Sequence, residues 1–199
     1  MKEGRFLRIG GYASGAVLIV FGVVVIVLGA WGFVFTRDHI EREGIVFGPI
    51  EDPAVAEHAE QWAGEPVDTG RKALAMAEIM RTHTLSNTGG LTYAEMGQYQ
   101  SAANPEDPKG TNDEAAAAKD ANGQPVSNGA RSIWVTETAL ATALDMGFMS
   151  EMLSIFSIIV GFALLLTGIG LVILARAVFG RTGAEMNVAP APIPGAAAG

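Results

Sequence analysis

Three histidines and many carboxylates are the residues of this chain whose types are suited to catalysis or metal binding. His39, His58 and His83 do not pair at the i, i+4 spacing that places two metal ligands on one helix face. The chain has no cysteine, which excludes disulfides, thiolate metal sites and cysteine nucleophiles. It also has no glycine-rich phosphate loop, no nucleophile elbow and no distinctive acid–base pair of carboxylates. The sequence therefore predicts a protein that is not an enzyme and that binds no metal or other cofactor.

His83 is the one histidine that we single out as a ligand candidate. The sequence predicts a helix over residues 71–85, on which His83 shares one arc with apolar residues: Ala73, Met76, Ala77, Ile79 and Met80. A histidine on such an arc is more often a buried, hydrogen-bonded core residue than a ligand or a general base. We therefore expect His83 to be buried, with a role in ligand binding as the alternative.

Two long apolar stretches are the main structural elements predicted from the sequence. Charged residues are absent from residues 9–36 and from residues 152–175. A helix needs about 20 apolar residues to cross the hydrocarbon core of a bilayer, so the sequence predicts transmembrane helices over residues 11–35 and 152–175. Their length disfavours buried core helices. The first stretch also exceeds the apolar region of about 7–15 residues in a signal peptide, which favours an uncleaved anchor.

A small residue recurs every seven positions in both spans: Gly15, Gly22 and Gly29 in the first, and Gly161, Gly168 and Ala175 in the second. Residues seven apart share a helix face, and small residues there let two helix backbones approach closely. The pattern predicts a tight helix pair, formed either by the two spans of one chain or by copies in an oligomer.

The basic residues near the span ends predict the orientation. Five of them lie before the first span or after the second span: Lys2, Arg5, Arg8, Arg176 and Arg181. Two, Arg37 and Arg42, lie between the spans and close to the end of the first. Because Lys and Arg accumulate on the cytoplasmic side, both termini are predicted to be cytoplasmic and residues 36–151 to lie outside. We expect Trp31, Arg8 and Arg176 at the membrane interfaces. The predicted location is the plasma membrane of a bacterium, crossed twice.

The segment between the spans is strongly acidic. The termini carry a net charge of +3, which leaves −11 for the middle of a chain whose total is −8. This charge argues against binding to nucleic acid or to anionic lipid headgroups, since both require positive charge. The predicted partners are therefore membrane lipid and other membrane proteins, or a second copy of the chain, and not nucleic acid.

Local signals divide the acidic segment into elements. The first helix continues into water until Gly44, and Pro49 and Pro53 indicate loop. Asp68 or Thr69 can cap the helix over residues 71–85, and residues 92–95 match a capping box. Turn-forming residues predict a mobile loop over 104–129, in which residues 114–119 form at most a frayed helical turn. One helix then runs over residues 131–179.

The predicted fold is an all-α membrane protein, a two-transmembrane-helix hairpin with a small, mostly helical extracytoplasmic domain. Its parts are a basic cytoplasmic N-terminus (1–10), the first span (11–35), the acidic extracytoplasmic domain (36–151), the second span (152–175) and a cytoplasmic tail (176–199). The low-complexity, proline-rich composition of the tail predicts disorder.

Two spans, a helix ending at His83 and the stretch Gly89–Glu95 together resemble a family of small two-span membrane proteins of unknown function from high-GC Gram-positive bacteria. The resemblance covers most of residues 10–178, and residues 104–129 look like an insertion relative to shorter members. Automatic naming sometimes labels such proteins aromatic ring-opening dioxygenases. Ring-cleaving dioxygenases hold iron through clustered histidines and carboxylates in a sizeable soluble domain, and this sequence has no such set.

The sequence therefore favours a non-enzymatic interaction or assembly protein, an accessory subunit or scaffold in the bacterial cell envelope. The alternative is an extracytoplasmic solute or metal sensor that signals through the two helices. Neither span contains an ionisable residue, which removes the usual marker of an ion path or substrate site within a membrane.

Overall fold

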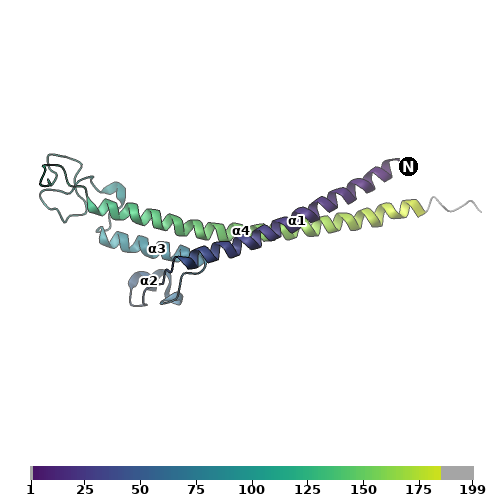
Figure 1. The fold of residues 1–199 in the computed structure, drawn as a ribbon, viewed down its shortest axis with the longest axis horizontal. Coiled ribbons are helices and arrows are strands. Elements are labelled where there is room, and N and C mark those ends of the chain that lie inside the picture. The colour runs from purple at the N-terminus through teal and green to yellow at the C-terminus, as the bar shows by residue number, and fades with distance from the viewer. Residues whose placement is uncertain (1, 185–199) are drawn as a thin grey trace, which may run out of the picture. The chain divides into compact units, whose positions relative to one another are not determined.

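The computed structural model describes residues 2–184, and within this range its regular elements are helices (Figure 1). In chain order they are α1 (Lys2–Arg42), α2 (Pro53–His58), the 3-10 helix η1 (Glu60–Trp62), α3 (Gly70–Asn87), the 3-10 helix η2 (Tyr93–Glu95) and α4 (Gly129–Ala184). The predicted all-helical fold class is confirmed at this level. The chain forms two compact units, unit 1 from residues 1–30 and 155–199 and unit 2 from residues 31–154.

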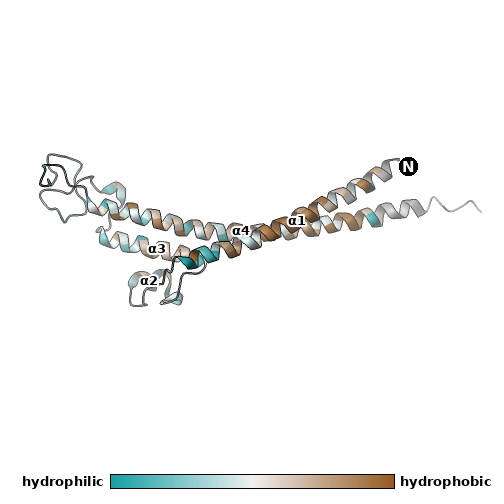
Figure 2. Ribbon diagram, in the orientation of Figure 1, coloured by the Kyte–Doolittle hydropathy of each residue, from teal (hydrophilic) through white to brown (hydrophobic). Residues whose placement is uncertain are grey.

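Both long helices, α1 and α4, are long and apolar enough to cross a membrane. Figure 2 shows their apolar residues concentrated in the stretches that belong to unit 1 and polar residues at the C-terminal end of α1. The predicted extension of the first helix is confirmed, because α1 continues to Arg42 and is followed by Gly44 at φ +63°. That backbone conformation favours glycine and turns the chain away from the helix. The predicted single helix over residues 131–179 is confirmed by α4.

Unit 2 has a small hydrophobic core. Its buried residues come from the end of α1, from α2, α3 and α4, and from the connections between α1 and α3: Ile40, Phe47, Ala54, Val55, Ala59, Val67, Ala73, Met76, Ala77, Ile79 and Leu144. Helix α3 begins where predicted, because the Thr69 hydroxyl accepts a hydrogen bond from the backbone N–H of Lys72 (3.3 Å). The core residues fix α3 against α2 and hold the end of α1 beside α4 within this unit.

The capping box at Thr92 is also confirmed, although the helix it opens is a single 3-10 turn. The Glu95 carboxylate accepts hydrogen bonds from the backbone N–H of Thr92 (2.8 Å) and from the Thr92 hydroxyl (2.7 Å). These two bonds hold the pKa of Glu95 below its ordinary value.

The prediction of loop around Pro53 is wrong. Pro53 is the first residue of α2, and Asp52 caps that helix by accepting a hydrogen bond from the N–H of Ala54 (2.9 Å). Proline is favoured at this position because its fixed φ suits a helix and its missing N–H would have no partner there. The buried side chains of Ala54 and Val55 then anchor the short helix in the core.

The segment before α4 contains isolated β-bridges and turns. Residues 114–119 form a single turn and no α-helix: the N–H groups of Ala116 and Ala117 donate to the carbonyls three residues before them (3.1 and 3.4 Å). The N–H of Ala118 then donates to the Gln100 carbonyl (2.9 Å), and the Ala118 carbonyl accepts from the N–H of Val126 (2.9 Å). After this turn the backbone therefore pairs with neighbouring segments instead of continuing as a helix. The Asn128 amide donates to the carbonyls of Gly97 (3.0 Å) and Pro108 (2.9 Å). These bonds define the path of the segment, whereas its mobility stays a prediction.

The predicted cytoplasmic tail is helical over its first part, since α4 continues to Ala184. The apolar run of the second span passes into a sequence without a strong helix breaker, so the helix does not end at residue 175. The rest of the predicted disordered tail, residues 185–199, lies outside the described residues.

Candidate functional site: a glycine interface, a buried carboxylate and an apolar cavity

Four of the glycines singled out from the sequence, Gly15, Gly22, Gly161 and Gly168, lie at a close contact between α1 and α4 in unit 1. Among the described residues of this unit, the buried ones are Gly15, Gly22, Gly29, Gly161, Gly168 and Ala175. Gly15 faces Gly168, and Gly22 faces Gly161, so the partner number falls as the number in α1 rises and the two segments run antiparallel. These contacts lie within one chain, and pairing between copies of the chain stays a prediction.

The separation of the two backbones leaves no room for a side chain. A Cβ atom built on Gly22 would lie 2.7 Å from the Gly161 carbonyl oxygen and 2.7 Å from the Leu165 nitrogen. A Cβ atom on Gly168 would lie 2.7 Å from the Gly15 carbonyl oxygen. Because these neighbours are backbone atoms, they cannot rotate away, and only glycine permits this approach.

The residues expected at membrane interfaces are all exposed. Trp31 is 63% exposed and stacks on Phe35 with ring centroids 5.1 Å apart. Arg8 and Arg176 are exposed on α1 and α4, and both lie in unit 1. Their exposure is compatible with an interfacial position, which stays a prediction.

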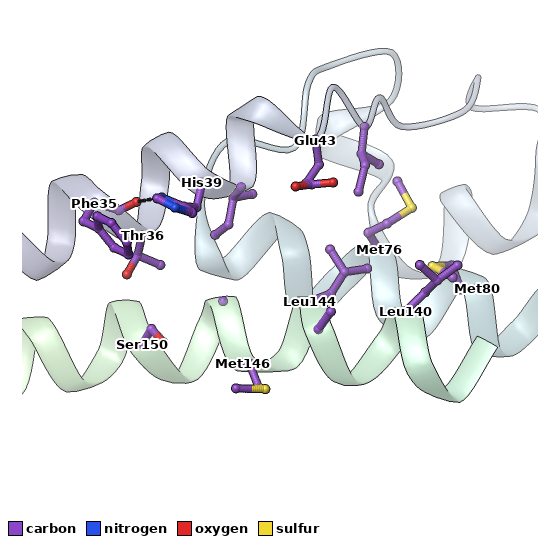
Figure 3. Close-up of a pocket in the computed structure, with 14 residues that line it drawn as sticks. Phe35, Thr36, His39, Glu43, Met76, Met80, Leu140, Leu144, Met146 and Ser150 are labelled. Carbon is purple, nitrogen blue, oxygen red and sulfur yellow. Dashed lines mark hydrogen bonds between the residues drawn. The ribbon is translucent and has the colours of Figure 1, made fainter. Parts of the chain in front are cut away.

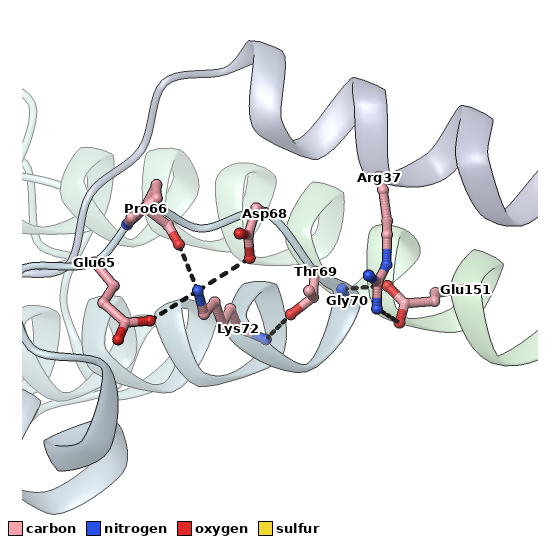
Figure 4. A network of polar contacts seen from close by, with 8 residues as sticks. All are labelled: Arg37, Glu65, Pro66, Asp68, Thr69, Gly70, Lys72 and Glu151. Atoms are coloured by element: carbon pink, nitrogen blue, oxygen red, sulfur yellow. Dashed lines mark hydrogen bonds and ion pairs between the residues drawn. The ribbon is translucent and has the colours of Figure 1, made fainter.

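Unit 2 contains a buried carboxylate that the sequence analysis did not single out. The Glu151 side chain is 4% exposed; its Oε1 accepts a hydrogen bond from Arg37 (3.1 Å), and its Oε2 accepts one from the backbone N–H of Gly70 (2.6 Å; Figure 4). Gly70 is the first residue of α3, where helix N–H groups lack intrahelical partners and carry partial positive charge. Glu151 thus joins α1, α3 and α4 through one side chain.

A second polar cluster lies at the start of α3. The Lys72 ammonium is 3.0 Å from carboxylate oxygens of Glu65 and Asp68 and donates to the Pro66 carbonyl at 3.0 Å (Figure 4). Desolvation lowers the pKa of Lys72, but hydrogen bonds to the two carboxylates outweigh it, and the pKa lies above its ordinary value. Lys72 is therefore held charged and ties the connection before α3 to that helix.

The expectation that His83 is buried is wrong. Its side chain is 48% exposed, and its Nε2 lies 2.9 Å from the Asp52 carboxylate. The residue next to it, Thr84, is buried instead, because the face of α3 that packs on the core turns away from His83 near the end of the helix. The hydrogen bond from His83 is the largest influence that lowers the pKa of Asp52.

An apolar cavity of about 630 Å³ lies between the end of α1, α3 and α4 within unit 2 (Figure 3). Its lining includes apolar side chains from all three helices: Phe35, Ile40, Met76, Met80, Leu140 and Leu144. Thr36, His39, Glu43 and Ser150 add polar groups. His39 Nδ1 lies 2.8 Å from the Phe35 carbonyl oxygen, which can only accept, so Nδ1 carries the hydrogen.

Several titratable side chains of unit 2 are already paired with neighbouring groups. Within the part of the chain that the structure describes, no three His, Asp or Glu side chains are grouped to hold a metal ion. His83 and Asp52 form a pair on the surface, and Glu151 is occupied by structural hydrogen bonds.

Comparisons with protein-family models, curated proteins and solved structures find no match to this chain. What can be said of its class therefore comes from its own geometry: a helical protein with two long apolar helices that could span a membrane.

Two features of the candidate site were missed from the sequence. Glu151 carries a weak signal, because it is a lone carboxylate directly before an uncharged stretch of more than 20 residues. The cavity has no local signal, since its walls come from segments 35–45, 76–80 and 140–150.

Proposed function

We propose that this chain is an integral membrane protein, a two-helix hairpin in the plasma membrane of a bacterium, with cytoplasmic termini and residues 36–151 outside. Its proposed role is non-enzymatic: an interaction or assembly protein that serves as an accessory subunit or scaffold in the cell envelope. Membership of the family of small two-span proteins named above is part of the same proposal and rests on the sequence resemblance.

The distribution of exposed side chains in unit 1 carries the proposal. Small residues occupy the buried contact between the helices, while large apolar side chains point outward, such as Val20 (61% exposed), Phe21 (62%) and Leu166 (67%). Only 11% of the most apolar window of α1 and 17% of that of α4 is buried. A core helix of a soluble protein would bury most of such a window, whereas lipid can cover an apolar surface of this kind.

An uncharged face of α4 in unit 2 supports the interaction role. Val135, Thr142, Met146 and Met149 follow one another at steps of seven, four and three residues, which places them on one side of a helix. All four are exposed, including Val135 at 59% and Met149 at 67%. Exposed apolar side chains in a row on a helix of an otherwise acidic segment are typical of a surface that packs against another protein.

Labelling of single cysteines tests the topology, because the chain has none of its own. Asn122→Cys lies on an exposed turn, and Gly10→Cys has open space around it. A membrane-impermeant maleimide should label Asn122→Cys in intact cells and Gly10→Cys only after permeabilisation. The reverse pattern would refute the orientation, and recovery of the full chain in the aqueous fraction without detergent would refute the membrane assignment.

Gentle purification with two matched variants tests the interaction role. Thr142→Arg places a charge in the middle of the uncharged face, and Thr136→Arg places the same charge on another exposed side of α4. Proteins that co-purify with the chain, or its own oligomers on a native gel, should be lost with Thr142→Arg and retained with Thr136→Arg. Equal recovery with both variants would show that this face does not mediate assembly.

A further inference from the structure

The apolar cavity of unit 2 has two chemically different ends. In Figure 3, Thr36, His39 and Ser150 lie at one end together with the Phe35 ring, Glu43 lies between the ends, and Met76, Met80 and Leu140 lie at the other end. Its volume of about 630 Å³ is in the range of sites that enclose small organic ligands, about 300–1,000 Å³. The cavity therefore suits a small ligand with one polar and one apolar end.

The apolar end favours a flexible hydrocarbon chain. Met76 and Met80 are unbranched and polarizable, and such side chains adapt to chains of irregular path. Leu140 is 51% exposed at the edge of the cavity, so the apolar lining extends to an opening through which a chain can enter.

The polar end favours a head group that donates hydrogen bonds. Because Nδ1 of His39 donates to the Phe35 carbonyl, Nε2 of the neutral ring is an acceptor. The Glu43 carboxylate lines the cavity between His39 and Met76 in Figure 3 and is also an acceptor. It lies in a segment whose net charge is −11, which opposes an anionic head group.

We propose that this cavity binds a single-chain amphiphile whose head group is an alcohol or an amine, with the chain against Met76, Met80 and Leu140 and the head near His39 and Glu43. This site goes beyond the proposed assembly role and does not depend on the orientation of the chain. Each methylene that moves from water into the cavity should raise the affinity about fourfold until the cavity is full.

Photolabelling of the full-length chain in phosphatidylcholine nanodiscs tests this site. The probe is hexadecanol with a diazirine in the middle of its chain, and labelled peptides are mapped by mass spectrometry. We expect labelling of peptides that contain residues 76–80 and 140–144. Unlabelled hexadecanol and hexadecylamine should compete, and hexadecanoate should compete at least tenfold less well. Glu43→Gln should reduce that difference.

Two tryptophan variants provide the matched comparison. Ala143 is exposed and lines the cavity, so Ala143→Trp should fill it and reduce the labelling there at least tenfold. Thr138 is exposed on the same helix but does not line the cavity, so Thr138→Trp should leave the labelling unchanged. Equal labelling in the two variants, or equal competition by hexadecanoate, would overturn the proposal.

The apolar stretches of α1 and α4 are an internal reference, because any lipid-soluble probe reaches a helix that faces lipid. If the membrane proposal fails, the labelling of residues 16–30 and 158–174 is absent. If only the cavity proposal fails, those residues are labelled and residues 76–80 and 140–144 are not. A final experiment replaces the alcohol probe with a diazirine-bearing phosphatidylcholine. Strong labelling of the cavity by this probe would assign the site to bilayer phospholipid and overturn the proposal of a single-chain ligand.

Discussion

Replacement of Gly168 by alanine should separate α1 from α4 in unit 1. The added Cβ atom would lie 2.7 Å from the Gly15 carbonyl oxygen and 2.8 Å from the Ile19 nitrogen, against 3.4 Å at the lower end of ordinary van der Waals contact. A gap of about 0.7 Å must therefore open, the difference between 3.4 and 2.7 Å. A radial gap of this size removes about a quarter to a half of the dispersion energy of each contact it widens.

The expected cost follows from this geometry. Overpacking a well-packed contact costs about 1–3 kcal/mol. Alanine also stabilises a helix by about 1 kcal/mol relative to glycine. The control must therefore be another glycine-to-alanine replacement in the same helix. Gly170 lies on the same helix with open space around its Cβ position. Gly168→Ala should therefore weaken the helix pair by about 1–3 kcal/mol relative to Gly170→Ala, which is about 5- to 150-fold in the equilibrium constant.

A designed disulfide measures this equilibrium. The Cβ position of Gly11 lies 3.0 Å from the Ala175 Cβ, slightly closer than the 3.5–4.5 Å found across disulfides. With Gly11→Cys and Ala175→Cys as the only thiols, the ratio of bridged to reduced chain in a glutathione buffer reports how often the helices are closed. Gly168→Ala should lower that ratio, and Gly170→Ala should leave it unchanged or raise it. Equal ratios in the two variants would refute the backbone contact.

Two further predictions concern unit 2. Glu151→Ala should lower the free energy of unfolding of this unit by about 1–3 kcal/mol, because the N–H of Gly70 and the Arg37 guanidinium lose an acceptor. Glu151→Gln should lower the free energy of unfolding by less. Denaturant unfolding that ranks the two variants in reverse would contradict this role. His83→Ala should raise the pKa of Asp52 toward its ordinary 3.8, as measured by carbon NMR of the carboxyl group. Since the folded pKa of Asp52 is lowered, its contribution to stability is present above 3.8 and lost as the pH falls through the folded pKa. The variant should thus be less stable than the parent at neutral pH and equal to it well below the folded pKa; a difference that persists in acid would contradict the linkage.

Several elements could be predicted because their causes are local. The uncharged stretches form the apolar parts of α1 and α4, and Thr69 caps α3 through a contact three residues away. The seven-residue spacing of the glycines is a helical periodicity, so it places them on one face before any partner is known. Pro53 shows the limit of local signals, since a proline suits both a loop and the first turn of a helix.

The sequence by itself determined where the long helices lie and which of their faces carries small residues, because lack of charge and periodicity act within one segment. Only the tertiary structure decided what those faces contact, that His83 points to Asp52 at the surface, and that Glu151 closes the N-terminus of α3 from 81 residues away. The cavity likewise exists because three segments that are distant in the sequence leave a space where they pack together. Such features depend on the distances between backbones after folding, which no spacing along a single segment specifies.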